Sequence, residues 1–250
     1  MKTTFIYLFL LSGSLILSNC GTKGTSSEKQ TAETTVGNDW KVSHTNCNIK
    51  VGNITFTKAV NGADSLVTFM DSGALEFRCN EKQDFFCDPN GEALSNNTAP
   101  LLLTQVDNTK PFTLTAKVTP RFTATGTYNA ADLFVFANDT LWQKFAFEQD
   151  ERGKHRIVSV RTRGTSDDNN HDVLTVPSVY MRISSDGRTI ASYYSLDKKE
   201  WQLARLYKND YPKDLWVGIC NQCPTEKGSS SLFEEVSLEQ NSVGDFRIGD

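Results

Sequence analysis

Short runs of alternating or β-rich residues, separated by turn signals, make up most of this chain. No segment after residue 38 has a sustained helical period, whereas runs such as 112–118, 131–137 and 141–148 are rich in aromatic and β-branched residues. Asp186-Gly187 between two such runs is a hairpin signal. About a dozen strands in one unit must bury their apolar faces against one another. The pattern predicts an all-β fold, an antiparallel two-sheet β-sandwich of jelly-roll type.

One of these runs places an unusual set of side chains on one face. Alternate residues of a strand point to opposite faces, so Phe145 and Phe147 share a core face, while Trp142, Lys144 and Glu148 share the other. An indole flanked by an amine and a carboxylate suits a sugar, which offers a C–H face for stacking and hydroxyls for hydrogen bonds. The alternative is a solvated outer face with a surface ion pair.

The N-terminus has the layout of a bacterial lipoprotein signal. An apolar run over residues 5–17 is shorter than the roughly 20 residues of a membrane-spanning helix. It ends in Leu17-Ser18-Asn19-Cys20, which resembles the lipobox, although Asn19 stands where a small residue is usual. We expect a signal peptide over 1–19 and lipidation at Cys20. The alternative is an ordinary signal peptide with a chance cysteine.

The remaining chain divides into a tether and one domain. Residues 20–38 are rich in Ser, Thr, Gly, Lys and Glu and are expected to be flexible. Residues 39–250 are enough for a single sandwich domain. The formal net charge of −4 gives no sign of a nucleic-acid partner. We therefore expect a protein of the cell envelope, periplasmic or at the cell surface, held to its membrane only through the lipid.

Five cysteines follow Cys20, in keeping with export. Cys79 and Cys87 flank a polar turn and are candidates for a disulfide. Cys220 and Cys223 follow a run that reads as a strand, which favours a structural pair over a redox pair or half of a zinc site. We predict no cofactor and no metal site in the chain.

The order of landmarks along the domain resembles that of the DUF1349 family. The resemblance covers residues of about 65–240. Its motifs, in chain order, are Asp84-Phe85-Phe86-Cys87-Asp88-Pro89-Asn90-Gly91, Ala99-Pro100-Leu101-Leu102, Phe112-Thr113-Leu114-Thr115-Ala116-Lys117-Val118, Tyr128-Asn129-Ala130-Ala131-Asp132-Leu133, Trp142-Gln143-Lys144, Val160-Arg161-Thr162-Arg163-Gly164 and Tyr193-Tyr194-Ser195-Leu196-Asp197 before Trp201.

The resemblance implies a concanavalin A-like lectin/glucanase sandwich, in which a curved sheet presents a concave face. The family is similar to the appended sandwich domains of some xylosidase-type glycoside hydrolases, and it includes the yeast regulation-of-enolase protein. It offers no established catalytic residues to transfer. Asp132 and Lys198 each stand where the family commonly has a glycine, so a site at Asp132 is expected to differ.

Carboxylates near the unusual strand are candidates for catalysis. A laminarinase-type carboxylate motif fails after Glu148, because its third glutamate would fall on Arg152 or Gly153. If the hairpin turns at Asn138-Asp139, Asp132 pairs close to position 145 and Glu148 lies beyond it. Glycoside hydrolysis needs two carboxyl groups at a defined separation. The alternative for Asp132 and Glu148 is pairing with Lys144 or Arg161, which suits binding.

A hydrophilic segment, Asp167–Asp172, follows Arg161 and Arg163. We interpret it as a loop at the rim of a cleft, with Ca²⁺ as a less favoured reading because the spacing does not match an EF-hand.

The leading hypothesis is a lipid-anchored, extracytoplasmic lectin-like domain that binds carbohydrate or polysaccharide on its concave face without catalysis. One alternative is a glycoside hydrolase using Glu148, Asp132 or Asp84. Another is a regulatory or scaffolding module, which an exposed apolar patch would favour. Trp201 is equally a candidate for the core. The predicted ligand-binding residues are Trp142, Lys144, Glu148, Arg161, Tyr193, Trp201 and Asp84.

Overall fold

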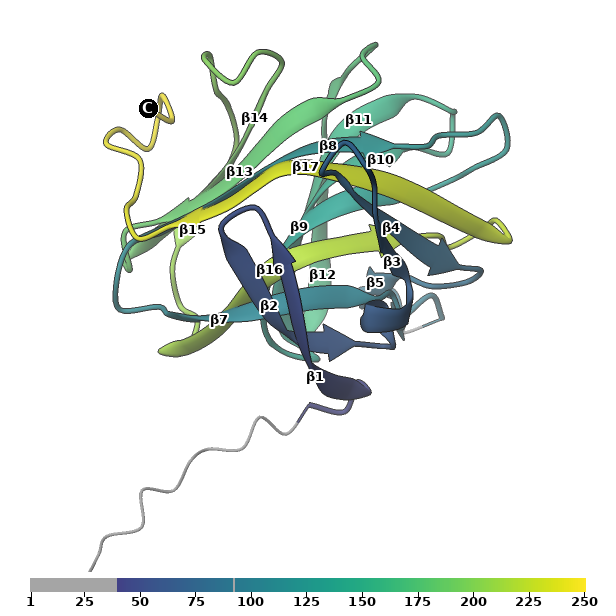
Figure 1. Ribbon diagram of the computed structural model, residues 1–250, viewed down its shortest axis with the longest axis horizontal. Coiled ribbons are helices and arrows are strands. Elements are labelled where there is room, and N and C mark those ends of the chain that lie inside the picture. The colour runs from purple at the N-terminus through teal and green to yellow at the C-terminus, as the bar shows by residue number, and fades with distance from the viewer. Residues whose placement is uncertain (1–39, 92) are drawn as a thin grey trace, which may run out of the picture. The chain divides into compact units, whose positions relative to one another are not determined.

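The alternating runs form strands in two packed antiparallel sheets (Figure 1). The protein's structure is a computed structural model that describes residues 40–91 and 93–250. These residues belong to one compact unit. The signal segment, Cys20 and the tether lie outside them. The prediction of an antiparallel two-sheet sandwich is confirmed.

The first sheet has eight strands. In spatial order they are β1 (His44–Val51), β2 (Ile54–Val60), β7 (Leu101–Asp107), β16 (Asp214–Gln222), β9 (Ala130–Asn138), β10 (Leu141–Gln149), β11 (His155–Arg163) and β12 (Thr165–Val173).

The second sheet has seven strands. In spatial order they are β15 (Gln202–Lys208), β14 (Thr189–Ser195), β13 (Val179–Ser185), β8 (Phe112–Pro120), β17 (Gly228–Glu239), β4 (Leu75–Asn80) and β3 (Val67–Phe69).

Two small elements complete the described part of the chain. A two-stranded ribbon pairs β5 (Phe85–Phe86) with β6 (Asn96–Asn97), and the 3-10 turn η1 spans Ala63–Ser65. Within residues 40–91 and 93–250, no helix is long and apolar enough to cross a membrane.

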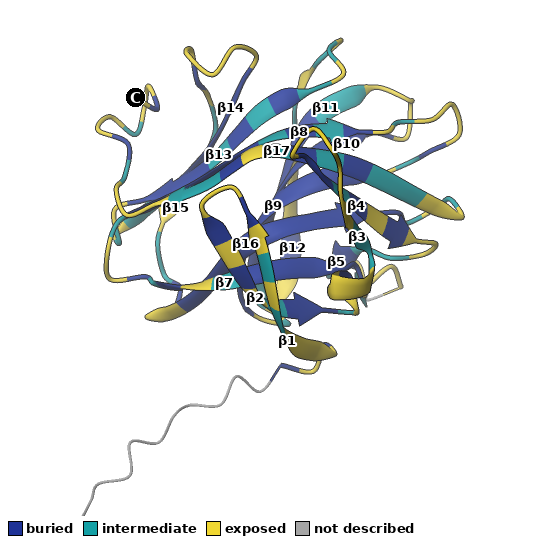
Figure 2. Ribbon diagram, viewed as in Figure 1, coloured by how far each residue is buried: buried dark blue, intermediate teal, exposed yellow. Residues whose placement is uncertain are grey.

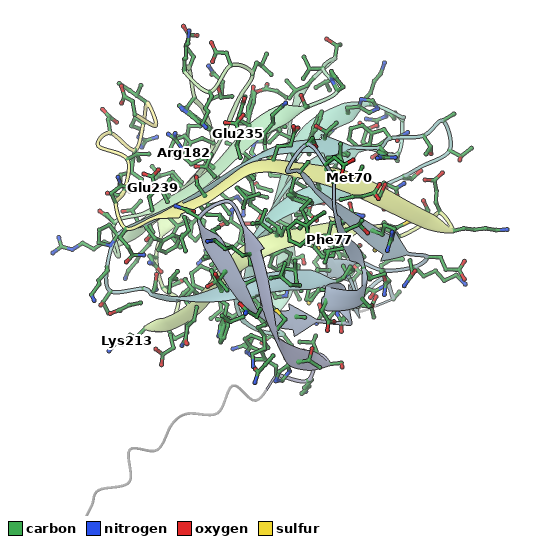
Figure 3. The ribbon with its side chains drawn as sticks, viewed as in Figure 1. Met70, Phe77, Arg182, Lys213, Glu235 and Glu239 are labelled. Carbon is green, nitrogen blue, oxygen red and sulfur yellow. The ribbon has the colours of Figure 1, made fainter. Side chains whose placement is uncertain are left out.

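The main core lies between the sheets. Phe145 and Phe147 of β10 point into it together with Leu133 and Val135 of β9, as alternation predicts. From the second sheet, Phe77 of β4 points into the same core (Figure 3). Central strands β16, β9 and β10 are buried along nearly their whole length (Figure 2). Burial along a whole strand means that both of its faces are covered.

A second apolar layer covers the outer face of the first sheet. Trp40 packs edge-on against Phe136 and Trp216, with ring centroids 4.8 and 5.4 Å apart, and its indole N–H donates to the Ala137 carbonyl at 2.9 Å. The Asp139 carboxylate accepts the backbone N–H groups of residues 41 and 42 at 2.8 and 2.9 Å. The N-terminal end of the domain is thus fixed onto this sheet face.

The ribbon of β5 and β6 covers the neighbouring part of that face. Phe85 is fully buried, and its ring meets Phe134 and Trp142 edge-on at 5.2 and 5.6 Å. Edge-to-face packing of this kind adds to the stabilisation from buried area alone. Together with Trp40, the ribbon fills most of the face that a lectin-like sheet would leave open.

Candidate functional site

A cleft of about 470 Å³ remains on the outer face of the first sheet, beyond the ribbon. Lys144 and Glu148 of β10 form its floor with Gln222, the last residue of β16. Asp84 borders it from the segment before β5, and Asp168 from the edge strand β12. Three of the predicted site residues, Asp84, Lys144 and Glu148, therefore meet in one cleft.

Lys144 is the centre of a hydrogen-bonded chain. Its ammonium is almost completely buried and donates to Asp84 Oδ1 at 2.9 Å and to Gln222 Oε1 at 2.8 Å. Burial alone disfavours the ammonium, but the carboxylates of Asp84, Glu148 and Asp132 outweigh it and hold the pKa of Lys144 above its ordinary value. Lys144 is therefore a fixed positive charge at any physiological pH.

The side-chain amide of Gln222 connects Lys144 to Glu148 through hydrogen bonds. Because an ammonium can only donate, the amide oxygen of Gln222 must face Lys144. Its amide nitrogen then donates to Glu148 Oε2 at 3.1 Å and to the Tyr128 carbonyl at 2.7 Å. The direction of every hydrogen bond from Lys144 to Glu148 is thus determined.

Glu148 is an acid that stays protonated at neutral pH. Burial raises the pKa of its carboxyl to about 8, Lys144 opposes the rise, and Asp84, Asp168 and Asp132 add to it. A carboxylic acid of this kind donates one hydrogen bond, which an ordinary surface glutamate does not.

Asp132 lies on the same sheet face but is fully buried and does not line the cleft. It pairs with Ala146, because the hairpin closes with the pair Asn138 and Leu141 and a bulge after Leu141 then shifts the register by one residue. Neither carboxylate oxygen has a hydrogen-bond partner of good geometry among the described residues. Burial raises the pKa of Asp132 to about 7, against the attraction of Lys144. Asp132 therefore adds a negative charge beneath the cleft when it is ionised, and it is not placed to contact a ligand.

Aromatic and apolar side chains form the rim of the cleft. Tyr128 is 41% exposed, Phe86 is half-buried and Leu94 is exposed. Tyr128 has a φ of 62°, which is uncommon for an aromatic residue, and its N–H donates to the Gln149 carbonyl at 2.7 Å. Its accessible ring beside the polar floor is suited to stacking on a sugar.

The prediction that Trp142 is a stacking platform is wrong. Alternation places it on the face of Lys144 and Glu148, but its ring is 0% exposed under Phe85 and beside Phe134. Its indole N–H is satisfied by the Asp139 carbonyl at 3.2 Å. Trp142 belongs to the apolar layer that covers the sheet.

Arg161 was also expected in the site, and the register places it elsewhere. It pairs across the strands with Gln143, whereas Lys144 pairs with Val160. Directly paired residues share a face, so Arg161 lies on the side opposite Lys144. There its guanidinium donates to Asp210 at 2.6 Å.

Tyr193 and Trp201 lie on the outer face of the other sheet and not in the cleft. They form a small apolar cluster with Val243, and the Tyr193 hydroxyl donates to the Phe246 carbonyl at 2.8 Å. Arg182, labelled in Figure 3, places its guanidinium 3.6 Å from the centre of the Trp201 ring. The C-terminal segment covers these residues, so their predicted ligand role is wrong.

The two predicted disulfides are absent from the described residues. Cys79, Cys220 and Cys223 are thiols, which excludes a bond from Cys79 to Cys87 or from Cys220 to Cys223. Cys220 and Cys223 are an odd number of residues apart on an extended chain, so they point to opposite faces. Cys79 instead donates to the Gln83 side chain at 3.2 Å.

The segment Asp167–Asp172 is a strand and not a rim loop. It forms most of β12, the edge strand, and Asp168 pairs with Val160. Edge strands often carry charged residues, which oppose pairing with another chain. Among the described residues, no group of three or more His, Cys, Asp or Glu side chains is arranged to hold a metal ion.

Most residues of the cleft were not among the predicted site residues. Gln222 lies between two cysteines and had no assigned role, and Asp168 was read only as part of a hydrophilic segment. Tyr128 and Phe86 stood in motifs of the family resemblance without an assigned role. Alternation along β16 places Gln222 on the face of Cys220, but only the strand order 16-9-10 brings it to Lys144.

Several solved structures share this fold. A functionally unknown protein from Saccharomyces cerevisiae matches at 24% identity with a TM-score of 0.62, over 70% of this chain and 97% of that one. The GH43 protein BlXynB from Bacillus licheniformis matches at 12% identity with a TM-score of 0.55, over 73% of this chain and 36% of the enzyme. An engineered GH43 glycoside hydrolase with endo-xylanase and exo-arabinofuranosidase activity matches at 14% identity with a TM-score of 0.56, over 89% and 42%.

These likenesses establish the fold, and for the two GH43 proteins this chain spans about two fifths of their length or less. No curated protein matches the sequence. A family model does match, over residues 67–241, which is most of the domain. The chain therefore belongs to the family described as "Protein of unknown function (DUF1349)".

Proposed function

We propose that this protein is a lectin-like module that binds carbohydrate in the cleft formed by Asp84, Tyr128, Lys144, Glu148 and Gln222. The observation that carries the proposal is an accessible aromatic ring beside a fixed row of hydrogen-bonding groups, in a cleft large enough for a sugar unit. Sugars combine an apolar C–H face with hydroxyl groups. The aromatic ring suits the C–H face, and the row of hydrogen-bonding groups suits the hydroxyls. The fold it shares with a GH43 glycoside hydrolase that has endo-xylanase and exo-arabinofuranosidase activity supports the same ligand class.

Replacing Tyr128 with Ala should weaken saccharide binding about five- to thirtyfold, because the loss of a stacking partner removes on the order of 1–2 kcal/mol from a weak complex. Calorimetric titration with neutral plant and microbial oligosaccharides measures the effect. Phe69→Ala, at an exposed aromatic on β3 remote from the cleft, is the matched control and should bind like the unaltered protein. Equal binding by both variants would contradict the role of Tyr128.

Glycoside hydrolysis is a second candidate, favoured by one observation. A protonated Glu148 and the Asp84 carboxylate, held by Lys144, share one cleft, and acids in contrasting states are what an acid-catalysed hydrolysis uses. Release of reducing ends from the same saccharides, abolished in Glu148→Gln, would favour this function over binding alone.

We further propose that the domain is anchored to a membrane of the cell envelope through lipid on Cys20. The proposal depends on the apolar run, the Leu17-Ser18-Asn19-Cys20 ending and the polar segment that follows. A linker of about 18 residues would let the domain lie tens of ångströms from the bilayer.

Cys20→Ser should move the protein from the membrane fraction, which detergent solubilises, to the aqueous fraction, because no acyl chain can then be attached. Circular dichroism should show that the sandwich still folds. If the Cys20→Ser protein remains with membranes, the anchor is not at Cys20.

A further inference from the structure

The hydrogen bonds around Glu148 leave one of its oxygens for a ligand. Gln222 donates to Oε2, and the carbonyl oxygen of a neutral carboxyl is its stronger acceptor, so we assign the proton to Oε1. Oε1 has no protein partner among the described residues, yet it is not one of the buried oxygens that lack one. Glu148 lines the cleft, so Oε1 opens toward it. The floor of the cleft thus presents an O–H donor in a fixed direction.

The charges around this donor limit what can meet it. Asp84, Glu148 and Asp168 are the acids that line the cleft, and Lys144 is the one cation among the described lining residues. The ammonium of Lys144 is already engaged by Asp84 and Gln222. A ligand carboxylate or sulfate would therefore meet at least one uncompensated negative charge at short range. An uncharged acceptor oxygen, such as a ring, glycosidic or N-acetyl oxygen, meets no such penalty.

We infer that Glu148 donates a hydrogen bond from Oε1 to an uncharged oxygen of the saccharide, so that the cleft binds neutral saccharides in neutral solution, rejects acidic ones, and loses affinity in alkaline solution. The inference depends on the proposed carbohydrate binding and specifies its ligand class. Loss of the proton would turn the donor into a carboxylate beside Asp84 and Asp168, which both removes the hydrogen bond and adds a charge.

Two other acids near Glu148 ionise in the same direction as the pH rises, because burial raises the pKa of Asp132 and of Asp168. Lys144 on its own strand keeps its charge, because its pKa lies above the ordinary value. Arg156, opposite on β11, is turned to Asp150 at 2.6 Å. Asp84 and Asp168 are the other charges across the cleft, and burial with nearby acids keeps the pKa of Tyr128 above its usual value of 10. Asp132 on β9 titrates near pH 7, so it requires its own control.

The test is calorimetric titration of the full chain at pH 7 and pH 9.5. The probes are xylohexaose, cellohexaose and chitohexaose as neutral saccharides and hexagalacturonate as an acidic one. For a neutral probe that binds at pH 7, affinity should fall at least tenfold at pH 9.5, because only the protonated fraction of Glu148 binds and its pKa is about 8. Hexagalacturonate should bind at least tenfold more weakly than that probe at pH 7.

Glu148→Gln is the decisive variant. The amide introduced by this substitution accepts from Gln222 through its oxygen and presents an N–H donor to the cleft, and it does not titrate. Binding should therefore persist at pH 7 and, within about threefold, at pH 9.5. Glu151→Gln, at an exposed glutamate outside the cleft, should keep the pH dependence of the unaltered protein. Asp132→Asn should keep the loss above pH 8, since its buried carboxyl does not reach the ligand.

Three results would overturn the inference while leaving carbohydrate binding in place. They are constant affinity from pH 7 to 9.5, loss of binding at pH 7 in a folded Glu148→Gln protein, and binding of hexagalacturonate as tight as that of the neutral probe. Thermal unfolding of each variant identifies a folding defect. If none of the probes binds at either pH, the proposed function fails, and this inference fails with it.

Discussion

Replacing Lys144 with Met should lower the free energy of unfolding by about 3–5 kcal/mol at pH 8, the cost typical of removing one partner from a buried ion pair. Lys144 is 3% exposed and donates to Asp84 and Gln222. Methionine fills a similar volume, so the loss reports charge more than packing. Without the ammonium, the carboxyl groups of Asp84, Glu148 and Asp132 remain in a poorly solvated site with nothing to compensate them.

The size of this loss should depend on pH. Lys144 attracts the carboxylates of Glu148 and Asp132, and this attraction exists only when they are ionised. Both folded-state pKa values, about 8 and about 7, lie above the ordinary values of 4.5 and 3.8, so each acid costs stability as the pH rises toward its folded pKa. Removing Lys144 raises both pKa values further. The variant should therefore lose more stability at pH 8 than at pH 5.

Chemical denaturation at pH 5 and pH 8 measures this difference. Lys110→Met is the control, because Lys110 is 66% exposed and pairs with Asp107 at 3.6 Å. An exposed pair contributes less than about 1 kcal/mol, so this variant should unfold almost like the unaltered protein at both pH values. An equal deficit for Lys144→Met at pH 5 and pH 8 would mean that lost packing, and not charge, explains it.

Replacing Trp142 with Ala should cost about 3–5 kcal/mol of stability, as for other fully buried aromatic residues. The substitution leaves a cavity between Phe85 and Phe134 and removes the hydrogen bond to the Asp139 carbonyl. The ribbon of β5 and β6 packs against this ring, so its contact with the sheet should loosen.

Thermal or denaturant unfolding checks this expectation. Leu196→Ala is a suitable control, since Leu196 is an exposed apolar residue at the end of the β14 hairpin and its truncation should change stability by less than about 0.5 kcal/mol. Trp142→Phe, which keeps a ring in the layer, should recover part of the loss. If Trp142→Ala unfolds like the unaltered protein, the ring is not a structural member of the layer.

Alternation along the strands was enough to predict the fold and one face of the site. It placed Phe145 and Phe147 in the core and put Trp142, Lys144 and Glu148 together on the opposite face. Alternation gives no information about which segments cover that face. Trp40 and Phe85 reach the sheet from segments remote in sequence, and no local pattern shows where they pack. A tryptophan that looked exposed by period was therefore buried by tertiary contacts.

The remaining differences concern register and strand order. Arg161 was assigned to the site as a charge that could pair with Glu148 across the sheet, but its cross-strand pairing with Gln143 places it on the opposite face. Tyr193 and Trp201 lie on the other sheet, which the order of motifs could not show. Gln222 joins Lys144 only because β16 lies next to β9, a neighbour fixed by topology and not by sequence distance.

The attachment of Trp40 to the outer face of the first sheet has a mechanical consequence. The indole is held by Phe136 and Trp216, and the Asp139 carboxylate holds the backbone next to it. Asp139 is at the tip of the β9–β10 hairpin, and Glu148 is near the far end of β10, roughly 23 Å from Leu141 at the rise of an extended strand. Tension applied to the chain N-terminal to Trp40 would act first on the tip of the β9–β10 hairpin. The cleft-lining carboxyl of Glu148 would keep its geometry while the domain is pulled from that end.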